Sequence, residues 1–271
     1  MANNILRTQD YLTAISQILR GKRTQGEIDI AWMRSADIDD LIDLSSSLRI
    51  LDLANGRLRP QYQVLQSEGH QVYGIDLINR PAWSFEYQGY RLARLIFSLY
   101  LPHGNRANAH MRLVCGDVSR LPFTSSYFDL VTSVAALEHF LDVPSVVSEV
   151  NRVLRPGGVA WISVHLFSCP SGAHNLRLME IPLKNIPDGI DAWDHLRQRR
   201  VKITVPLNEW RIADYIECFA SRFEILKHYC ALREGEHLLT PEIEAELSGR
   251  GYTRDELTSG AYIIVARKPG S

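Results

Sequence analysis

Apolar residues recur at two spacings along the chain, and each spacing predicts one kind of element. Continuous apolar runs typical of buried strands lie at 48–53, 71–76, 111–115, 130–134 and 159–164. Apolar residues three to four positions apart predict helices at 61–67, 91–100 and 143–154. Because short buried strands that alternate with helices form parallel units, the pattern predicts an open α/β sheet.

The chain outside this alternation has a different texture. Helical spacing predicts a helix over 8–20 and a second over 37–44, separated by a break at Gly21–Gly26. Beyond residue 165 the chain is rich in Pro and Gly at first. Its later elements are then predicted as a helix at 208–220, a strand at 223–229, a short helix at 240–251 that begins at Thr240, and a closing strand at 261–267.

These patterns predict three regions of one chain. Residues 1–47 form an N-terminal helical cap. Residues 48–164 form the core, with a helical insertion at 78–110. Residues 165–271 supply a substrate-covering segment and the closing strands of the same domain. Ligands of open α/β sheets bind beyond the carboxyl ends of the strands, which places Asp52–Gly56, Asp76, Asp117 and Ser133–Glu138 around one crevice.

A series of motifs then follows in a fixed order. Its segments are GDVSRLPF at 116–123, SYFDLV at 126–131, LEHFLD at 137–142, and Glu149 followed by NRVLRPGG at 151–158. In this series the chain resembles the small-molecule class I S-adenosylmethionine-dependent methyltransferases. The resemblance implies an enzyme of the EC 2.1.1 type. It also implies a Rossmann-like fold: a mostly parallel seven-stranded sheet with helices on both faces and an antiparallel C-terminal strand.

The resemblance implies which residues bind S-adenosylmethionine. These are Asp52, Ala54, Asn55, Gly56, Asp76, Leu77, Asp117, Val118 and Ser133. Asp76 ends the second strand, where an acid accepts hydrogen bonds from ribose hydroxyls; the alternative is a helix cap or a surface acid. Phe128, Asp129 and the Pro156–Gly158 turn are interpreted as residues that only build the fold.

The cofactor loop departs from the family pattern. The family has G-x-G-x-G after the first strand, whereas this chain has Ala54 and Leu58 in the two outer positions and only Gly56 in the middle. Glycine serves there because the backbone must approach the ligand and adopt positive φ. The departure leaves a second hypothesis open, a degenerate methyltransferase-like scaffold or binding protein without catalysis. A nicotinamide-dependent reductase is disfavoured, since G-x-G-x-x-G is absent from this loop.

Several side chains offer chemistry for the acceptor. Methyl transfer needs a base only when the nucleophile carries a proton of high pKa, and His139, His165 and His195 are the candidate bases, with His174 also near the crevice. Aromatic residues of the 78–110 insertion, and Trp193 and Trp210 further on, either line an apolar pocket or pack extra helices. The sequence leaves the small-molecule acceptor unidentified.

The charge and the cysteine content of the chain indicate which partners and metal ions are expected. The formal net charge of −1 supports binding neither to nucleic acid nor to a membrane, and the densest basic cluster, Arg197 to Lys202, is interpreted as a solvated helix face. The four cysteines form no CxxC pair, so we expect no metal site and no disulfide framework. With no apparent signal peptide, a cytoplasmic location is expected. The oligomeric state does not follow from the sequence.

Overall fold

The computed structural model describes residues 2–79, 83–102, 111–174, 189–200, 202–203 and 205–270. By their contacts these residues divide into two compact units. The first unit comprises residues 1–134, 149–160 and 268–271, and the second comprises 135–148 and 161–267. The division into a cap, a core and a covering segment stays a prediction.

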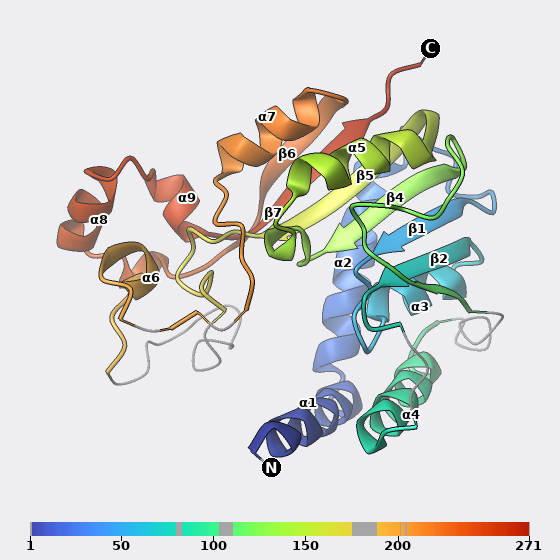
Figure 1. Ribbon diagram of the computed structural model, residues 1–271, viewed down its shortest axis with the longest axis horizontal. Coiled ribbons are helices and arrows are strands. Elements are labelled where there is room, and N and C mark those ends of the chain that lie inside the picture. The colour runs from blue at the N-terminus through green and yellow to red at the C-terminus, as the bar shows by residue number, and fades with distance from the viewer. Residues whose placement is uncertain are drawn as a thin grey trace. The chain divides into compact units, whose positions relative to one another are not determined.

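Seven strands form one mixed sheet, coloured along the chain in Figure 1. They are β1 (Arg49–Leu53), β2 (Gln71–Asp76), β3 (Arg112–Cys115), β4 (Phe128–Val134), β5 (Leu154–His165), β6 (Glu224–Arg233) and β7 (Ser259–Arg267). Their order is β3-β2-β1-β4-β5-β7-β6. The pairs β1–β2, β1–β4 and β2–β3 are parallel, whereas β6 and β7 are antiparallel. The predicted fold class is therefore confirmed.

The N-terminal helices differ from the prediction. The helix α1 (Ala2–Leu19) contains the predicted segment, but α2 (Lys22–Ile38) occupies the predicted break, and no helix covers 37–44. Gly21 separates the two helices with φ 74°. The predicted break was wrong because α2 buries polar side chains as well as apolar ones: Glu27 and Arg34 are buried beside Ala31 and Ile38, which conceals the helical spacing of its inner face.

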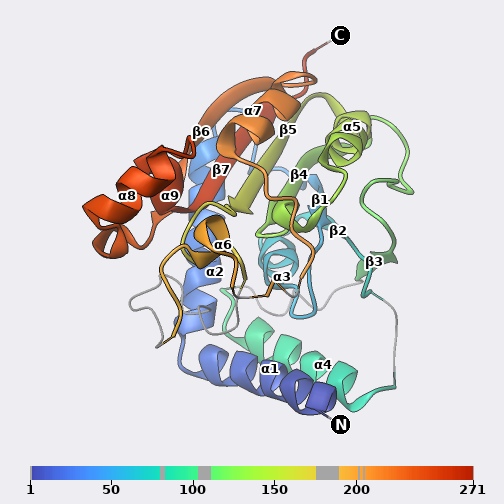
Figure 2. The same ribbon diagram turned by 60° about the vertical axis from the view of Figure 1, so that its left-hand side comes forward.

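The aromatic insertion packs a helix against the N-terminal helix. The helix α4 (Phe85–Leu99) lies beside α1 in both views (Figures 1 and 2). The Tyr11 ring meets those of Phe85 and Tyr90 edge-on, at centroid distances of 6.2 and 6.1 Å. Phe97 is buried in a cluster with Ile18. The packing interpretation therefore holds for these aromatic residues, with α1 as the partner.

The residues interpreted as fold-building do have that role in the first unit. One carboxylate oxygen of Asp129 accepts the Arg49 backbone N–H at 2.8 Å, and the other pairs with Arg155 at 2.6 Å. Gly157 has φ 73°, the left-handed conformation that glycine adopts readily, and it lies within β5, which begins directly after α5 (Val143–Val153). The helix α3 (Pro60–Ser67) follows β1 and begins with proline, which has no N–H to leave unsatisfied in the first turn.

The second unit has its own apolar cluster. Its helices are α6 (Asp194–Arg197), α7 (Ile212–Ala220), α8 (Pro241–Ser248) and α9 (Arg254–Thr258). Trp193 is buried with Phe167, Leu247 and Leu257, and its indole N–H faces the carbonyls of Ser168 and Leu257, both at 3.1 Å. Trp193 therefore packs the unit. None of the described helices is long and apolar enough to span a bilayer.

Candidate active site

The loop after β1 bends through several left-handed residues. In it Ala54 has φ 50°, Gly56 φ 63° and Arg59 φ 55°. The left-handed conformation costs a residue with a Cβ about 1 kcal/mol or more. The backbone thus has the form that glycine normally provides at position 54, although alanine occupies it. The Ala54 N–H donates to the Ile75 carbonyl at 2.8 Å, which holds the loop to β2.

Asp52 anchors the helix that follows the loop. Its carboxyl is buried and accepts the backbone N–H of Tyr62, in the first turn of α3. Burial raises the pKa of Asp52 to about 8, and the Arg34 guanidinium acts in the opposite direction. Arg34 itself donates to Gln61 at 2.6 Å. Asp52 therefore supports the shape of the cofactor loop. Its direct contact with the cofactor stays a prediction.

Asp76 lies at the carboxyl end of β2 and faces the same loop. One of its oxygens accepts the Gly56 N–H at 2.9 Å, and the other accepts the Ile78 N–H at 3.0 Å. Each carboxylate oxygen has a second lone pair, so the group can still accept from a ligand hydroxyl. The next side chain, Leu77, is 68% exposed and offers apolar surface beside the carboxylate.

The neighbouring strands bring the remaining predicted residues to the same edge of the sheet. Asp76 pairs in register with Cys115 of β3, and Leu53 pairs with Ser133 of β4. Asp117 is exposed two residues beyond β3, and one of its oxygens accepts the Ser119 N–H at 2.8 Å. Val118 is buried, and the Ser133 hydroxyl lies 3.5 Å from the Leu53 carbonyl oxygen. The ends of four adjacent parallel strands thus hold the predicted cofactor residues in one unit.

The chemistry of this edge fits S-adenosylmethionine. The amide oxygen and nitrogen of Asn55 are both buried without a hydrogen-bond partner among the described residues. A Cβ added to Gly56 would meet no atom within 4 Å, so space is open beside the loop. The two carboxylates can accept hydrogen bonds from the ribose hydroxyls and the adenine amino group, and the exposed apolar side chain can contact the adenine ring. The open backbone at Gly56 lets the cofactor approach the loop. Gly74 beneath the loop makes room for Asn55, because its Cβ would lie 2.1 Å from the amide nitrogen.

The two non-glycine residues of the loop should respond oppositely to glycine. Ala54→Gly should raise the free energy of unfolding by up to about 1 kcal/mol, because it removes a left-handed alanine. Leu58→Gly should lower it by about 3–5 kcal/mol, because Leu58 is buried in the cluster of Ile18 and Phe97. Urea denaturation of both variants measures this. An Ala54→Gly chain no more stable than the natural one would mean that position 54 carries no strain.

The candidate histidines belong to the second unit and differ in their surroundings. His165 is buried, and its Nε2 lies 2.7 Å from the Ser171 hydroxyl, which also donates to Glu234. His195 is buried, and its Nε2 donates to the Phe167 carbonyl at 2.8 Å. Burial lowers the pKa of both rings. These contacts favour structural roles for His165 and His195.

His195 makes stability depend on pH. Burial lowers its pKa to about 4, below the 6.5 of an unhindered ring, so the unfolded chain binds one more proton between these values. The free energy of unfolding should therefore fall as the pH drops from 6.5 to 4, by up to about 3 kcal/mol from this residue. His195→Gln should flatten that fall by one proton in urea titrations at several pH values. The exposed His237→Gln is the control, and an unchanged slope in His195→Gln would contradict the assignment.

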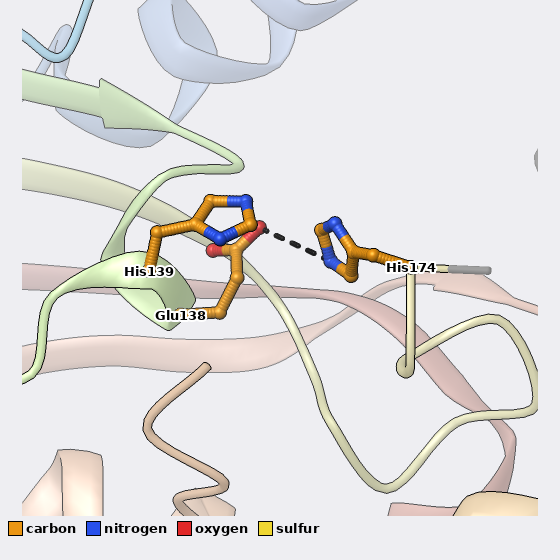
Figure 3. A group of neighbouring side chains, drawn as sticks. All are labelled: Glu138, His139 and His174. Atoms are coloured by element: carbon orange, nitrogen blue, oxygen red, sulfur yellow. Dashed lines mark ion pairs between the residues drawn. The ribbon is translucent and has the colours of Figure 1, made fainter. Parts of the chain in front are cut away.

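His139 and His174 lie on either side of a buried carboxyl group. Figure 3 shows Glu138, His139 and His174 turned toward one another. Glu138 Oε1 is 3.9 Å from His174 Nε2, and the His139 and His174 rings are 4.7 Å apart. Burial raises the pKa of Glu138 to about 8 and lowers that of His174 to about 3. At neutral pH these shifts leave both groups uncharged, so the contact is not an ion pair despite its distance. The sequence analysis placed Glu138 at the end of the crevice range and in a motif, but it assigned this residue no role of its own.

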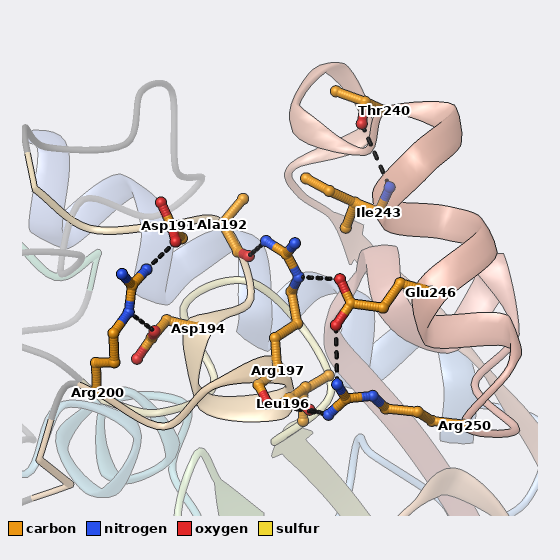
Figure 4. A network of polar contacts seen from close by, with 10 residues as sticks. All are labelled: Asp191, Ala192, Asp194, Leu196, Arg197, Arg200, Thr240, Ile243, Glu246 and Arg250. Carbon is orange, nitrogen blue, oxygen red and sulfur yellow. Dashed lines mark hydrogen bonds and ion pairs between the residues drawn. The ribbon is translucent and has the colours of Figure 1, made fainter.

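The basic cluster is neutralised by acids of the same unit (Figure 4). Arg197 pairs with Glu246 at 2.7 Å, and Arg250 pairs with the other oxygen of that carboxylate at 2.8 Å. Arg200 pairs with Asp191 and Asp194. Arg199 pairs with Glu209 at 2.6 Å. These ion pairs account for three of the four charges of the cluster and support its interpretation as a solvated face rather than an anion site. Thr240 caps α8 by accepting the Ile243 N–H, as predicted.

The sequence of this chain is similar to those of known methyltransferases. The family profile described as a methyltransferase domain matches residues 51–162. A 24-methylenesterol C-methyltransferase 2 of Oryza sativa is 31% identical over 150 residues, which are 51% of this chain and 35% of that protein. A demethylmenaquinone methyltransferase of Mycobacterium marinum is 43% identical over 106 residues, 38% of this chain and 41% of that protein. The chain thus spans well under half the length of these relatives.

Solved structures agree on the fold. An S-adenosylmethionine-dependent methyltransferase from Mesorhizobium loti superposes with a TM-score of 0.50 at 21% identity, covering 86% of this chain and 96% of that one. A Listeria monocytogenes protein described in the same way gives 0.51 at 14% identity, covering 88% and 99%. At such identities the likeness concerns the fold alone. The family model matches residues 51–162 to a methyltransferase domain, and the sheet order is the one expected from the resemblance to class I S-adenosylmethionine-dependent methyltransferases.

Proposed function

We propose that this chain transfers the methyl group of S-adenosylmethionine to a small-molecule acceptor. The observation that carries the proposal is the set of polar groups at the ends of β1, β2 and β3: the Gly56 backbone, the Asp76 carboxylate and the Asp117 carboxylate, all in one unit. Such groups at adjacent parallel strand ends are what a nucleoside needs for recognition.

Each residue has a distinct task in this proposal. Asp76 accepts from the ribose hydroxyls while its bond to the Gly56 N–H fixes its orientation. Asp117 accepts from the adenine amino group, and the exposed Leu77 covers a face of the ring. The cofactor, when bound, would supply a methyl group on a sulfonium: in-line attack by the acceptor on that carbon would break the carbon–sulfur bond, with the thioether of S-adenosylhomocysteine as the leaving group. The chain then has to align the acceptor with that methyl carbon and exclude water.

The acceptor is proposed to be a lipophilic small molecule. This proposal rests on the names of the relatives, which include sterol and demethylmenaquinone methyltransferases. Those names say what those proteins act on, and their identity to this chain is confined to part of its length. The base role of His139, His165 and His195 stays a prediction.

A scaffold without catalysis is the second candidate, and one observation favours it. Ala54 has φ 50° at a position where the family has glycine. Alanine adopts this left-handed conformation less readily than glycine, so the loop adopts its cofactor-binding form at a higher free-energy cost. If Ala54→Gly raised the affinity for S-adenosylmethionine from undetectable to measurable, the natural chain would be a scaffold. The proposed enzyme requires binding by the natural chain.

Turnover tests the proposal directly. The full chain is incubated with S-adenosylmethionine that carries a labelled methyl group, together with a panel of sterols, quinols and polar hydroxylated compounds. We expect formation of S-adenosylhomocysteine that depends on an acceptor, and label in the lipophilic fraction. Label in the polar fraction would revise the acceptor class. Binding of cofactor without label in any fraction would favour the scaffold.

A further inference from the structure

Two buried polar side-chain atoms of the second unit lie close together with no hydrogen-bond partner in the part of the chain that the structure describes. Glu138 Oε1 and His174 Nε2 lie 3.9 Å apart, and neither has a hydrogen-bond partner among the described residues. The Glu138 side chain is only 1% exposed. A buried polar atom without a partner costs about 1–3 kcal/mol. A pair of such atoms pointing at one space therefore indicates that something polar belongs there.

His139 completes the group with a nitrogen of fixed tautomer. Its Nδ1 lies 2.9 Å from the Pro206 carbonyl oxygen. Because a carbonyl only accepts, the proton must be on Nδ1, and Nε2 keeps its lone pair. A backbone carbonyl that orients the far nitrogen of a histidine is the usual outer support of a metal ligand. One ligand atom each from Glu138, His139 and His174 lie within 4.8 Å of one another.

The backbone holds the third ligand in an unusual conformation. His174 has φ 51°, in the left-handed region, and its ring is 4.8 Å from that of His165.

The other oxygen of Glu138 is 3.4 Å from the His165 backbone nitrogen, so only Oε1 faces the space between the three side chains. Bonds of about 2.0–2.2 Å from a metal ion set neighbouring ligand atoms about 3 Å apart, so the group must close by about 1 Å or more.

We propose that Glu138, His139 and His174 bind a divalent first-row transition-metal ion such as Zn²⁺ or Co²⁺. Two imidazole nitrogens and one carboxylate oxygen are ligands that such ions accept, and three protein ligands leave positions for water or an oxygen of a small molecule. A bound cation would also supply the positive charge that an ionised Glu138 carboxylate needs in its buried surroundings. The three ligands belong to the second unit, whereas the predicted cofactor residues belong to the first, so metal binding can be measured without the methyl donor.

The site departs from the expectation of no metal. That expectation rested on the cysteines, whereas these ligands are nitrogen and oxygen atoms drawn from segments 35 residues apart. A neighbouring group, His165, Cys169 and Glu234, also has metal-like spacing. It is less suited to an ion because the Ser171 hydroxyl already bonds both the His165 ring and the Glu234 carboxylate.

Cobalt binding tests the site without any methyl donor. The full chain is stripped with a chelator and titrated with Co²⁺, and visible d–d absorption is recorded together with calorimetry for Zn²⁺. We expect one ion per chain. Glu138→Gln and His174→Gln should each weaken binding by at least about 100-fold, since loss of an outer support alone costs about 10–100-fold. His228→Gln, a histidine of β6 bonded to Tyr262, should bind as the natural chain does.

The outcomes separate cleanly. No cobalt spectrum in the natural chain would overturn the proposal, as would equal binding by the Glu138→Gln and His228→Gln chains. Circular dichroism reports whether each variant is folded. If Glu138→Gln does not fold, the more accessible His139→Gln takes its place with the same expected loss. If the natural chain transfers methyl groups but binds no metal, the proposed function stands and only this metal site is removed.

Discussion

Asp76→Asn should weaken the binding of S-adenosylmethionine by about 100-fold or more. The substitution replaces a carboxylate with a neutral amide and removes acceptors for the two ribose hydroxyls. Hydrogen bonds to a charged group contribute about 1.5–3 kcal/mol each, so even partial loss of two gives such a factor. Isothermal titration calorimetry of the full chain measures the change.

The control separates binding from folding. Asp76 also accepts the Gly56 and Ile78 N–H groups, and asparagine can replace only one of these acceptors, so a stability loss of about 1 kcal/mol is expected. Asp40→Asn removes an exposed acid of the same unit and should change neither affinity nor stability. Equal affinity in Asp76→Asn and the natural chain would remove Asp76 from the cofactor site.

Gly172→Ala should destabilise the chain by about 3 kcal/mol or more. A Cβ at this position would lie 2.3 Å from the Phe167 carbonyl oxygen and 2.4 Å from that of Leu166. Both neighbours are backbone atoms of the turn that leads from β5 toward His174, and they cannot rotate away as a side chain can. Overpacking typically costs about 1–3 kcal/mol, and a clash with fixed backbone belongs at the upper end.

Gly26→Ala is the matched control for that substitution. Gly26 lies within α2, and an added Cβ there would meet no atom within 4 Å. Alanine should therefore stabilise the helix by about 0.5–1 kcal/mol. Urea unfolding followed by circular dichroism compares the two. A Gly172→Ala chain as stable as the natural one would mean that the turn relaxes freely.

The sequence was most informative where one physical requirement decides a position. The strand runs gave β1 and β2 almost to the residue, because buried parallel strands need continuous apolar side chains. Helix α2 escaped prediction because its inner face carries Glu27 and Arg34, whose partners lie elsewhere in the chain. Polar burial of that kind becomes visible only when both partners are placed.

In the candidate site, too, some residues could be predicted from the sequence and others could not. Asp76 could be predicted because its strand and its spacing are local, and the Gly56 bond then appears in the structure. The buried place of Asp52 beneath α3 could not, since it depends on a helix packed against the strand. Glu138 and His174 are 36 residues apart, and only the folded second unit reveals that Glu138 Oε1 and His174 Nε2, which have no hydrogen-bond partner among the described residues, lie 3.9 Å apart.

The binding of S-adenosylmethionine and S-adenosylhomocysteine to the natural full chain tests the central claim most directly. Calorimetry at neutral pH should show saturable binding of both, with one site per chain, and competition between them. Binding should raise the thermal midpoint as ligand increases, because only the folded chain forms the loop around Gly56. An absence of heat and of thermal protection at millimolar ligand would contradict the claim that this edge of the sheet is a cofactor site.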